Sequence, residues 1–494
     1  MLPEERDPAA GHGQAAFLER VRPSDWRTPH ARALYDLVIV GGGPAGHAAA
    51  IAARALGLSV ALIERDRLGG NSLNKGSVPS KALVRSGRAL EAIVNSQAFG
   101  ASAVGDPLAD IGLVMQRMCR IRTRIAEHWS AKGLAATGVD VFFGRARFMD
   151  ETSVAVDAAQ LRFKKALVAT GAQPRRSEIA GLEDVGHLTS ATLFHLQSMP
   201  KRLAVIGGGP LGCEMAQAFA HMGSKVTILQ DEPKFLPQEE RDAAEILSLS
   251  LARAGVDTRL NTQITAARRA NGEKIIDANN VGVEYSIAVD EILLSIGRVA
   301  NTDDLNLDGA AIDRTECGDI RVDDYLRTSN ADVFAAGDVC MPHKFANIAE
   351  ATGRMAVHNA FGGEPQRHGA LIIPRCTFCD PEIAHVGMHI WDAHREQIPV
   401  KTFTVMMQDT DRAIIDGRDD GFVKIHVKDG SDEIIGATIV ASRASEMINE
   451  IAVIMHGKIG MRALATVMHT YPAQSDAIRM AAQAYVKSLR LRRP

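Results

Sequence analysis

The 494-residue sequence predicts an α/β protein in which two similar strand–loop–helix–strand units precede a C-terminal α+β domain. Two glycine-rich loops, Gly41–Gly46 and Gly207–Gly212, each follow a short β-branched run and precede an Ala-rich helical segment. Their first glycines lie 166 positions apart, which is too far for a solenoid repeat and suits two separate domains. From about residue 371 the pattern changes to alternating strands and then helices. We therefore expect two Rossmann-like dinucleotide-binding domains and a C-terminal α+β domain.

The composition excludes several classes of protein. Hydrophobic residues make up 46% of the chain and charged residues 23%, which is ordinary for a globular protein. Lys and Arg number 56 against 59 Asp and Glu, so the near-neutral charge gives no basis for binding nucleic acid. Six cysteines are too few for a disulfide-stapled secreted domain. The longest apolar stretch, residues 37–53, is interrupted by glycines and a proline, and the N-terminus does not read as a secretory signal. We expect a soluble cytoplasmic protein without a membrane span.

Along the chain, the elements are expected in the following order. Residues 1–34 are polar and punctuated by Pro and Gly, which predicts a mostly irregular arm. In the first unit we expect a strand at 36–40, a helix to about residue 56 and a strand at 60–64, and in the second a strand at 203–206, a helix to about 221 and a strand at 226–229. Residues 113–135 predict an Arg-rich amphipathic helix whose arginines face solvent, followed by short strands that stop at Gly171. The last domain is expected to contain strands at 422–427 and 434–440 and helices near 443–456 and 474–489.

The two glycine loops predict dinucleotide binding. In such a loop the first glycine permits a tight turn, the second lets the backbone approach a pyrophosphate, and the third lets the helix pack on the strand. These positions are Gly41, Gly43 and Gly46 in the first loop and Gly207, Gly209 and Gly212 in the second. The helix that begins with Pro44 and Ala45 would point its N-terminal amides at the phosphates. Two dinucleotides in one chain imply electron transfer between them, usually between a flavin and a nicotinamide.

The two second strands end in different residues. Glu64 lies 23 positions after Gly41, where a carboxylate binds ribose hydroxyls. Gln230 lies 23 positions after Gly207, and its amide would not repel a 2′-phosphate. Asp231 is adjacent to it, however, and Lys234 is the one close cation. NADH and NADPH both remain open.

The segment from Leu68 to Leu83, LGGNSLNKGSVPSKAL, resembles the flavoprotein disulfide reductases, and most closely their mercuric reductase branch beside dihydrolipoamide dehydrogenase. Four further motifs support the resemblance: Ala169–Pro174, Ser295–Arg298, Val333–Asp338 and Asp380–Gly387. The resemblance implies FAD on the first loop, NAD(P)H on the second, and a homodimer formed by the C-terminal domain. It implies an FAD-binding domain at 35–190 and 298–363, an NAD(P)-binding domain at 191–297 and an interface domain at 364–494.

The resemblance also implies roles for individual residues. Lys81 matches the family lysine that lies beside the flavin N5 and pairs with a glutamate, here Glu214. A cation there would stabilise negative charge on the reduced flavin, and its carboxylate partner would lower the cost of burying the ammonium. Asp338 is expected near the ribitol. The remaining cofactor contacts expected from the motifs are Gly70, Asn71, Thr170, Gly171, Gly297, Arg298 and Gly337.

The sequence departs from the family at its redox centre. Ser72 and Ser77 stand where the family has a C-x4-C redox disulfide, and a hydroxyl cannot carry electrons by forming and breaking an S–S bond. Tyr471 occupies the position of the catalytic histidine, as it does in the mercuric branch, and Asp476 replaces the glutamate that follows. Tyr471 could hydrogen-bond a quinone carbonyl. His469 either donates a proton to a substrate or is structural, and the two serines either fill the volume of the cysteines or bind a ligand.

The cysteines offer no substitute for the missing pair. Cys376 and Cys379 form a C-x-x-C on an expected strand, where residues three apart point to opposite faces, so a structural role is favoured. The other cysteines lack metal-ligand spacing, and we expect no metal site. The mercuric branch also carries a C-terminal cysteine pair, and the segment Leu489–Pro494 has none.

These observations favour an FAD enzyme that takes hydride from NAD(P)H and reduces a small, quinone-like acceptor directly from the flavin. Two alternatives stay open. The first is a mercuric or disulfide reductase in which Ser72 and Ser77 stand in place of natural cysteines. The second is a flavin-bearing redox sensor or binding protein without useful turnover.

Overall fold

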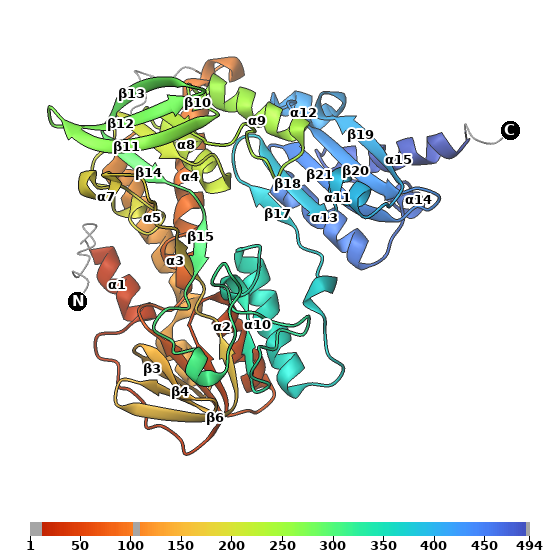
Figure 1. Ribbon diagram of the computed structural model, residues 1–494. Coiled ribbons are helices and arrows are strands. Elements are labelled where there is room, and N and C mark those ends of the chain that lie inside the picture. The colour runs from red at the N-terminus through yellow and green to blue at the C-terminus, as the bar shows by residue number, and fades with distance from the viewer. Residues whose placement is uncertain (1–11, 102–108, 491–494) are drawn as a thin grey trace.

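The computed structural model describes residues 12–101 and 109–490. The beginning of the predicted arm, residues 1–11, and the C-terminal residues 491–494 lie outside the described residues. Figure 1 shows two α/β parts, one above the other, and a C-terminal domain beside the upper one. The predicted α/β class and the C-terminal α+β domain are confirmed.

The first domain is built on a parallel sheet in the order β3-β2-β1-β6-β16. Antiparallel strands β4 and β5 extend the first half of β6. The helices α2 and α10 pack on each other and on the face of β1 that carries Leu37 and Ile39. Val38 and Val40 pack on the opposite face, so β1 is buried on both sides, as a parallel strand requires. The elements are β1 (Tyr35–Val40), α2 (Pro44–Ala55), β2 (Val60–Glu64), β3 (Val139–Phe143), β4 (Ala146–Asp150), β5 (Ser153–Val156), β6 (Ala159–Val168), β16 (Val333–Ala335) and α10 (Ala346–Phe361).

The second domain repeats this pattern with a parallel sheet in the order β10-β9-β8-β14. A three-stranded antiparallel sheet, β11-β12-β13, covers part of it, and two short paired strands, β7 and β15, carry the chain between the domains. The elements are β7 (Ala172–Pro174), α7 (Leu182–Val185), β8 (Arg202–Ile206), α8 (Pro210–His221), β9 (Lys225–Leu229), α9 (Arg241–Arg253), β10 (Asp257–Arg259), β11 (Thr262–Ala270), β12 (Glu273–Asn280), β13 (Val283–Val289), β14 (Glu291–Leu294) and β15 (Arg298–Ala300).

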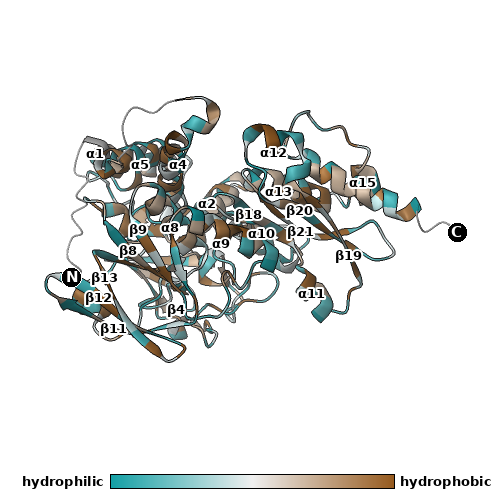
Figure 2. Cartoon of the chain, turned by 90° about the horizontal axis from the view of Figure 1, so that it is seen from above, coloured by the Kyte–Doolittle hydropathy of each residue, from teal (hydrophilic) through white to brown (hydrophobic). Residues whose placement is uncertain are grey.

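The C-terminal domain is a five-stranded antiparallel sheet in the order β17-β18-β21-β20-β19. Its predicted strands and helices are confirmed as β20, β21, α13 and α15. In Figure 2 hydrophobic residues follow β18, β20 and β21, where helices cover the sheet. The elements are β17 (Arg375–Thr377), β18 (Glu382–Gly387), α11 (Ile390–Arg395), β19 (Val400–Met406), α12 (Asp411–Asp416), β20 (Phe422–Lys428), β21 (Ile434–Ala441), α13 (Ala444–His456), α14 (Met461–Leu464) and α15 (Asp476–Arg490).

The predicted helix at 113–135 is two helices. The helix α5 (Ile111–Ile125) is followed by a 3₁₀ turn at Ala126–Trp129 and then by α6 (Ala131–Ala136). The Ser130 hydroxyl accepts a hydrogen bond from the Gly133 N–H at 3.2 Å and so caps a new helix inside the predicted one. Helices α3 (Gly70–Asn74) and α4 (Ser77–Val94) precede them and lead into the candidate site.

The prediction of an irregular arm is wrong for residues 12–21, because these residues form α1 (His12–Val21). Phe17 and Val21, four residues apart on this helix, are buried against the first domain. The prediction that the arginines of this helix face solvent is wrong at Arg122, which is 2% exposed. Its guanidinium carbon lies 4.4 Å from the centre of the Phe17 ring. The two corrections have one cause, because α1 supplies the cover that buries Arg122.

None of the helices in the described part of the chain combines the length and apolar character needed to cross a membrane.

Candidate functional site

The first glycine loop joins β1 to α2 and leaves room above its middle. Gly41 has φ +113°, and a Cβ there would lie 2.3 Å from the carbonyl oxygen of Ala169. A Cβ on Gly46 would lie 1.8 Å from the carbonyl oxygen of Gly41, so helix and strand approach at this point as predicted. A Cβ on Gly43 would meet only the Gly70 Cα, at 3.6 Å. The loop is therefore closed at both ends and open at its centre, where a pyrophosphate would approach.

Glu64, at the end of β2, is held against this loop. Its Oε2 accepts a hydrogen bond from the Gly42 N–H and its Oε1 one from the Asp66 N–H, both at 2.8 Å. Burial raises the pKa of the Glu64 carboxyl, and the two amide hydrogen bonds oppose that rise only in part. The side chain is thereby fixed at the mouth of the loop, where it lines the cavity described below.

The second loop, between β8 and α8, repeats this geometry. Gly207 has φ +99°, a Cβ on Gly212 would lie 2.2 Å from the Gly207 carbonyl oxygen, and nothing lies within 4 Å of a Cβ on Gly209. Gln230 takes the place that Glu64 holds in the first loop, because its Oε1 accepts a hydrogen bond from the Gly208 N–H at 2.7 Å. A neutral amide therefore makes the hydrogen bond that a carboxylate makes in the first domain.

A cavity of about 340 Å³ opens where the first loop, the start of α3 and α4, and the start of α8 converge. Most of the predicted site residues line it. They are Gly41, Gly43, Pro44, Ala45, Glu64, Gly70, Asn71, Ser72, Ser77, Lys81, Thr170, Gly171, Glu214, Arg298, Gly337 and Asp338. Positions separated by up to about 300 residues in the sequence thus meet in one cavity.

An ion pair lies in the wall of this cavity. The Lys81 Nζ, on α4, lies 2.7 Å from Glu214 Oε2, on α8. The Lys81 side chain is 33% exposed and the Glu214 side chain 3%, so the carboxylate is buried and the ammonium faces the cavity. Phe378 completes the arrangement, because its N–H donates to Glu214 Oε1 at 2.9 Å and its ring centre lies 4.6 Å from Lys81 Nζ. The ion pair inferred from the resemblance is therefore present.

A second ion pair also lines the cavity, where β15 returns to the first domain. Arg298 Nη1 lies 2.7 Å from Asp338 Oδ2, and Arg298 Nη2 donates to the carbonyl oxygen of Ala172 at 3.0 Å. Asn71 Nδ2 donates to the same carbonyl oxygen at 2.5 Å. These contacts tie β15 to Asp338 and, through Ala172 on β7, to the start of α3.

Two asparagines that the sequence analysis did not single out also line the cavity. Asn74 Oδ1 and Asn301 Oδ1 are buried and have no hydrogen-bond partner within the described protein. Buried acceptors are nearly always satisfied, so a bound molecule with polar groups fits this cavity. Together with the open cradle at Gly43, they suit an extended dinucleotide such as FAD. The sequence could have indicated both residues through their neighbours. Asn74 lies within the motif that carries the two serines, and Asn301 lies three residues after Arg298.

Ser72 lies within α3, and Ser77 is the first residue of α4. Both line the same cavity as Lys81. The six cysteines of the chain all lie in the described residues, and no disulfide joins any two of them. Burial raises the pKa of the Cys213, Cys340, Cys376 and Cys379 thiols, which disfavours the reactive thiolate. Cys376 lines the cavity and Cys379 is buried in the core.

Tyr471 and His469 lie elsewhere, on the C-terminal domain. The Tyr471 hydroxyl donates to Asp411 Oδ2 at 2.8 Å, and the residue is 74% exposed. The contact with Asp411 raises the pKa of the phenol. His469 Nε2 lies 2.8 Å from Glu450 Oε1. Within one chain, the structure does not bring these two residues to the cavity that Ser72 lines.

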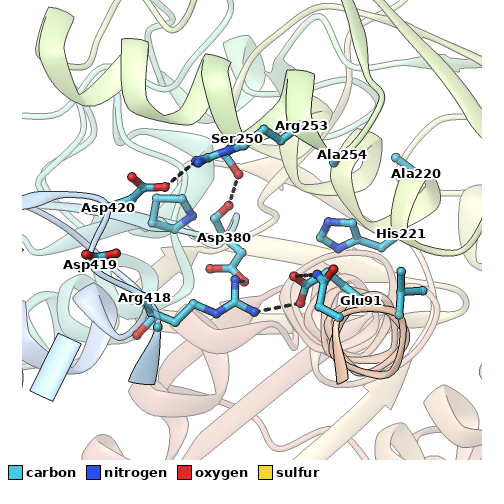
Figure 3. A pocket seen from close by; sticks show the side chains of 15 residues that line it. Glu91, Ala220, His221, Ser250, Arg253, Ala254, Asp380, Arg418, Asp419 and Asp420 are labelled. Carbon is cyan, nitrogen blue, oxygen red and sulfur yellow. Dashed lines mark hydrogen bonds and ion pairs between the residues drawn. The ribbon is translucent and has the colours of Figure 1, made fainter. Parts of the chain in front are cut away.

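A further cavity, of about 540 Å³, lies where α4, α8 and α9 meet the loop before β20 (Figure 3). Its charged side chains pair with one another. Arg418 lies 2.9 Å from Glu91 and 3.3 Å from Asp380, and Arg253 lies 2.5 Å from Asp420. The Arg418–Glu91 and Arg253–Asp420 pairs tie α4 and α9 to the loop before β20 in the C-terminal domain. No group of His, Cys, Asp and Glu among the described residues has a geometry that could hold a metal ion.

Two family matches cover most of the chain. Residues 35–362 match the pyridine nucleotide-disulphide oxidoreductases, and residues 373–482 match the dimerisation domain of the same proteins. The chain belongs to this family. The resemblance drawn from the sequence motifs is thereby confirmed. Family members are NAD(P)H-dependent flavin oxidoreductases that bind FAD.

Individual relatives span nearly the whole chain. A mercuric reductase of Lysinibacillus sphaericus is 29% identical over 92% of this chain and 83% of its own length. A dihydrolipoyl dehydrogenase of Geobacillus stearothermophilus is 32% identical over 91% of this chain and 95% of its own. Among solved structures, the Cu(II) complex of the HOCl-induced flavoprotein disulfide reductase RclA from Escherichia coli superposes with a TM-score of 0.81 at 26% identity, over 92% of this chain and all of that one.

Proposed function

We propose that this protein is a homodimeric FAD enzyme that takes hydride from NAD(P)H and reduces a small, quinone-like acceptor without a redox disulfide. The observation that carries the proposal is the cavity wall. It keeps the Lys81–Glu214 ion pair, whose carboxylate is buried, and presents Ser72 and Ser77 at the positions where the family resemblance implies sulfurs. The apparatus for flavin chemistry is therefore retained while thiol relay chemistry is not.

FAD, when bound, supplies the acceptor for hydride and the donor of two electrons. The residues of this chain supply the rest. The open glycine loop and the N-terminus of α2 would bind its pyrophosphate, and the anchored carboxylate of Glu64 would bind the adenosine ribose. Lys81, fixed by Glu214, would hold a positive charge beside the isoalloxazine, where negative charge develops during reduction. Arg298 and Asp338 would orient the ribitol end.

The acceptor class follows from the groups on the open side of the cavity. A quinone is flat, takes electrons directly from a flavin, and presents carbonyl oxygens that accept hydrogen bonds. The Ser72 and Ser77 hydroxyls can donate such bonds, and a hydroxyl is too weakly acidic to attack a disulfide or bind a soft metal. We assign the two serines to orienting the acceptor.

The proposed homodimer would account for the exposed position of Tyr471. In the same domain, Met468 is 94% exposed, Val453 67% and Val467 48%, which is apolar surface of the kind that subunit interfaces cover. These residues lie in the segment matched to the dimerisation domain. We propose that a second copy covers this face and that Tyr471 and His469 of each chain thereby reach the acceptor side of the other cavity.

Anaerobic stopped-flow spectroscopy tests the proposal. The oxidised holoenzyme is mixed with NADH or NADPH, and the flavin absorbance should bleach within seconds. A quinone added next should restore the absorbance faster than oxygen does, and arsenite should leave both rates unchanged because no dithiol takes part. Absence of bleaching with both nucleotides would favour the redox sensor instead, and inhibition by arsenite would contradict direct transfer.

A second candidate, mercuric or disulfide reduction, is favoured by the activities named for the relatives. It requires that cysteines belong at positions 72 and 77. The double variant Ser72→Cys/Ser77→Cys, assayed for NADPH-dependent Hg(II) and disulfide reduction, tests it directly. A large gain of either turnover supports this candidate, and no gain refutes it.

A further inference from the structure

The segment Phe378–Asp380 joins β17 to β18 in the C-terminal domain, yet it lies against the wall of the flavin-type cavity. Phe378 lines that cavity, and Cys379 belongs to the core cluster that joins α4 and α8. On its other side, Asp380 lines the second cavity shown in Figure 3. A short connection from one domain therefore separates two cavities and is in contact with both.

Phe378 touches both members of the ion pair. Its backbone N–H donates a hydrogen bond to Glu214 Oε1 at 2.9 Å, and the Lys81 ammonium donates one to Glu214 Oε2 at 2.7 Å. Both oxygens of a carboxylate that is 97% buried are thus satisfied, one by each neighbour. The ring of the same residue lies 4.6 Å from Lys81 Nζ, within the range in which an aromatic face attracts a cation. One residue therefore constrains the anion through its backbone and the cation through its side chain.

The backbone next to Phe378 is clamped from the side of α8. Gln217, one turn after Glu214, donates from Nε2 to the Asp380 carbonyl oxygen at 2.8 Å and accepts from the Asp380 N–H at 2.7 Å. The Ser250 hydroxyl, on α9, donates to the same carbonyl oxygen, as Figure 3 shows. The Asp380 backbone can therefore move little relative to the helix that carries Glu214.

A second clamp comes from α4, the helix that carries Lys81. Arg88, seven residues after Lys81, donates from Nη2 to the Cys379 carbonyl oxygen at 2.6 Å. Its Nη1 lies 3.2 Å from Glu382 Oε1, on β18. The segment is thus tied to both helices whose side chains form the ion pair, and the clamps fix the distance between the Phe378 ring and the Lys81 ammonium.

We propose that Phe378 is a positioning residue for flavin reduction, which it assists by holding the Lys81 ammonium at the flavin through its ring and its amide. The inference rests on the proposed function in one respect, the placement of Lys81 beside the isoalloxazine. A ring face beside the ammonium replaces water with an oriented quadrupole, so the charge stays close to the flavin and is less screened. The benefit is larger for the reduced flavin, because that form carries the negative charge.

Two substitutions at residue 378 test the proposal. Phe378→Leu keeps apolar bulk and the backbone amide but removes the aromatic face, whereas Phe378→Tyr keeps the face. Phe378→Leu should slow flavin reduction by NAD(P)H roughly five- to thirtyfold, the range expected for losing a partly desolvated cation–aromatic contact. If that factor reflects the equilibrium, it corresponds to a fall of about 20 to 45 mV in the midpoint potential of bound FAD. Phe378→Tyr should remain within about twofold of the wild type.

The chain offers a matched control in Phe422, whose ring centre lies 4.7 Å from the Lys424 Nζ on β20. Phe422→Leu removes the same kind of contact within the same domain, at a residue that does not line the cavity. It should lower thermal stability without changing the flavin potential. A shift in potential of equal size in Phe422→Leu and Phe378→Leu would overturn the proposal, because the effect would then come from loosened packing.

The midpoint potential is measured by reductive titration with a reference dye, so it does not depend on reactivity with NAD(P)H or on the acceptor. A wild-type potential in Phe378→Leu overturns the positioning role even if the proposed enzyme activity stands. A lowered potential in this variant supports the role even if no quinone is reduced. If Phe378→Leu fails to retain FAD, Gln217→Leu is measured instead. It loses both hydrogen bonds to the Asp380 backbone and adds no charge, so it should lower the potential in the same direction by a smaller amount, and an unchanged potential contradicts the proposal.

Discussion

The ion pair in the cavity wall is asymmetric, and this asymmetry gives a quantitative prediction. Glu214 is 3% exposed, whereas the Lys81 side chain is 33% exposed. Lys81→Met would leave a buried carboxylate whose remaining hydrogen bond comes from the Phe378 N–H. Breaking a buried pair in this way typically destabilises by 3–5 kcal/mol, and we expect about 3 kcal/mol because water can enter from the cavity.

The reverse substitution should be milder. Glu214→Gln leaves an ammonium that water already reaches, and the new amide oxygen can still accept the Phe378 N–H, so we expect a loss of about 1 kcal/mol. The double variant Lys81→Met/Glu214→Gln removes both charges and leaves no buried ion. Its loss should fall below the sum of the single losses by about 1.5 kcal/mol, which is the coupling energy of the pair.

Urea unfolding of the holoenzyme, followed by circular dichroism and by flavin fluorescence, measures these differences. The four proteins are compared at one pH and one FAD concentration, because bound cofactor stabilises the folded state. Equal losses in the two single variants would refute the reasoning, since they would mean that Glu214 is not buried as described. Strictly additive losses would refute it as well, since they would mean that the two side chains do not interact.

Four further predictions follow from other parts of the molecule. Gln230→Glu should lower kcat/KM for NADPH by about tenfold, because a carboxylate at the second loop repels a 2′-phosphate. The kcat/KM for NADH should change by less than about threefold. Steady-state kinetics with both nucleotides measures the difference. Burial would raise the pKa of Glu240, but a hydrogen bond from His426, the ion pair with Lys424 and the nearby His389 outweigh it and leave that pKa below its ordinary value. The ionised Glu240 therefore contributes its full stabilisation above about pH 4.5, and this contribution is lost as the pH falls further. Glu240→Gln should be about 3 kcal/mol less stable than the wild type at pH 7. In thermal melts the stabilities of the two proteins should converge as the pH is lowered. Met468→Lys should shift the protein from dimer to monomer in light scattering and abolish turnover while FAD stays bound, since the exposed methionine belongs to the proposed interface. Iodoacetamide at neutral pH should leave turnover unchanged and label Cys376 only as the pH rises well above its ordinary thiol range, because burial raises its pKa, which peptide mapping would show.

The parts of the site that the sequence predicted are those with a local signature. The glycine loops could be predicted because the spacing of their glycines reflects backbone geometry within six residues. Gly46 lies against the Gly41 carbonyl oxygen, as that spacing requires. Lys81 and Glu214 lie 133 residues apart, and the sequence linked them only through the family resemblance. Nothing in the residues themselves encodes their contact.

The features that were missed depend on contacts between distant elements. Phe378 sits among ordinary strand residues, and its approach to Lys81 follows from how the C-terminal domain docks on α4 and α8. The α1 helix has a short apolar stripe that is too weak to predict a helix, and burial of Phe17 against the first domain stabilises it. Arg122 looked like a surface residue for the same reason, since its cover comes from α1.

Counting the electrons that the holoenzyme takes up tests the central claim most directly. An enzyme with a redox disulfide accepts two electrons at the flavin and two at the disulfide, whereas one that relies on flavin alone accepts only the first two. Anaerobic titration with dithionite, followed by flavin absorbance and thiol content, should end at about two electrons per FAD with no new thiol. An end point near four electrons, or the appearance of about two new thiols per chain, would show that a disulfide takes part and would contradict the account.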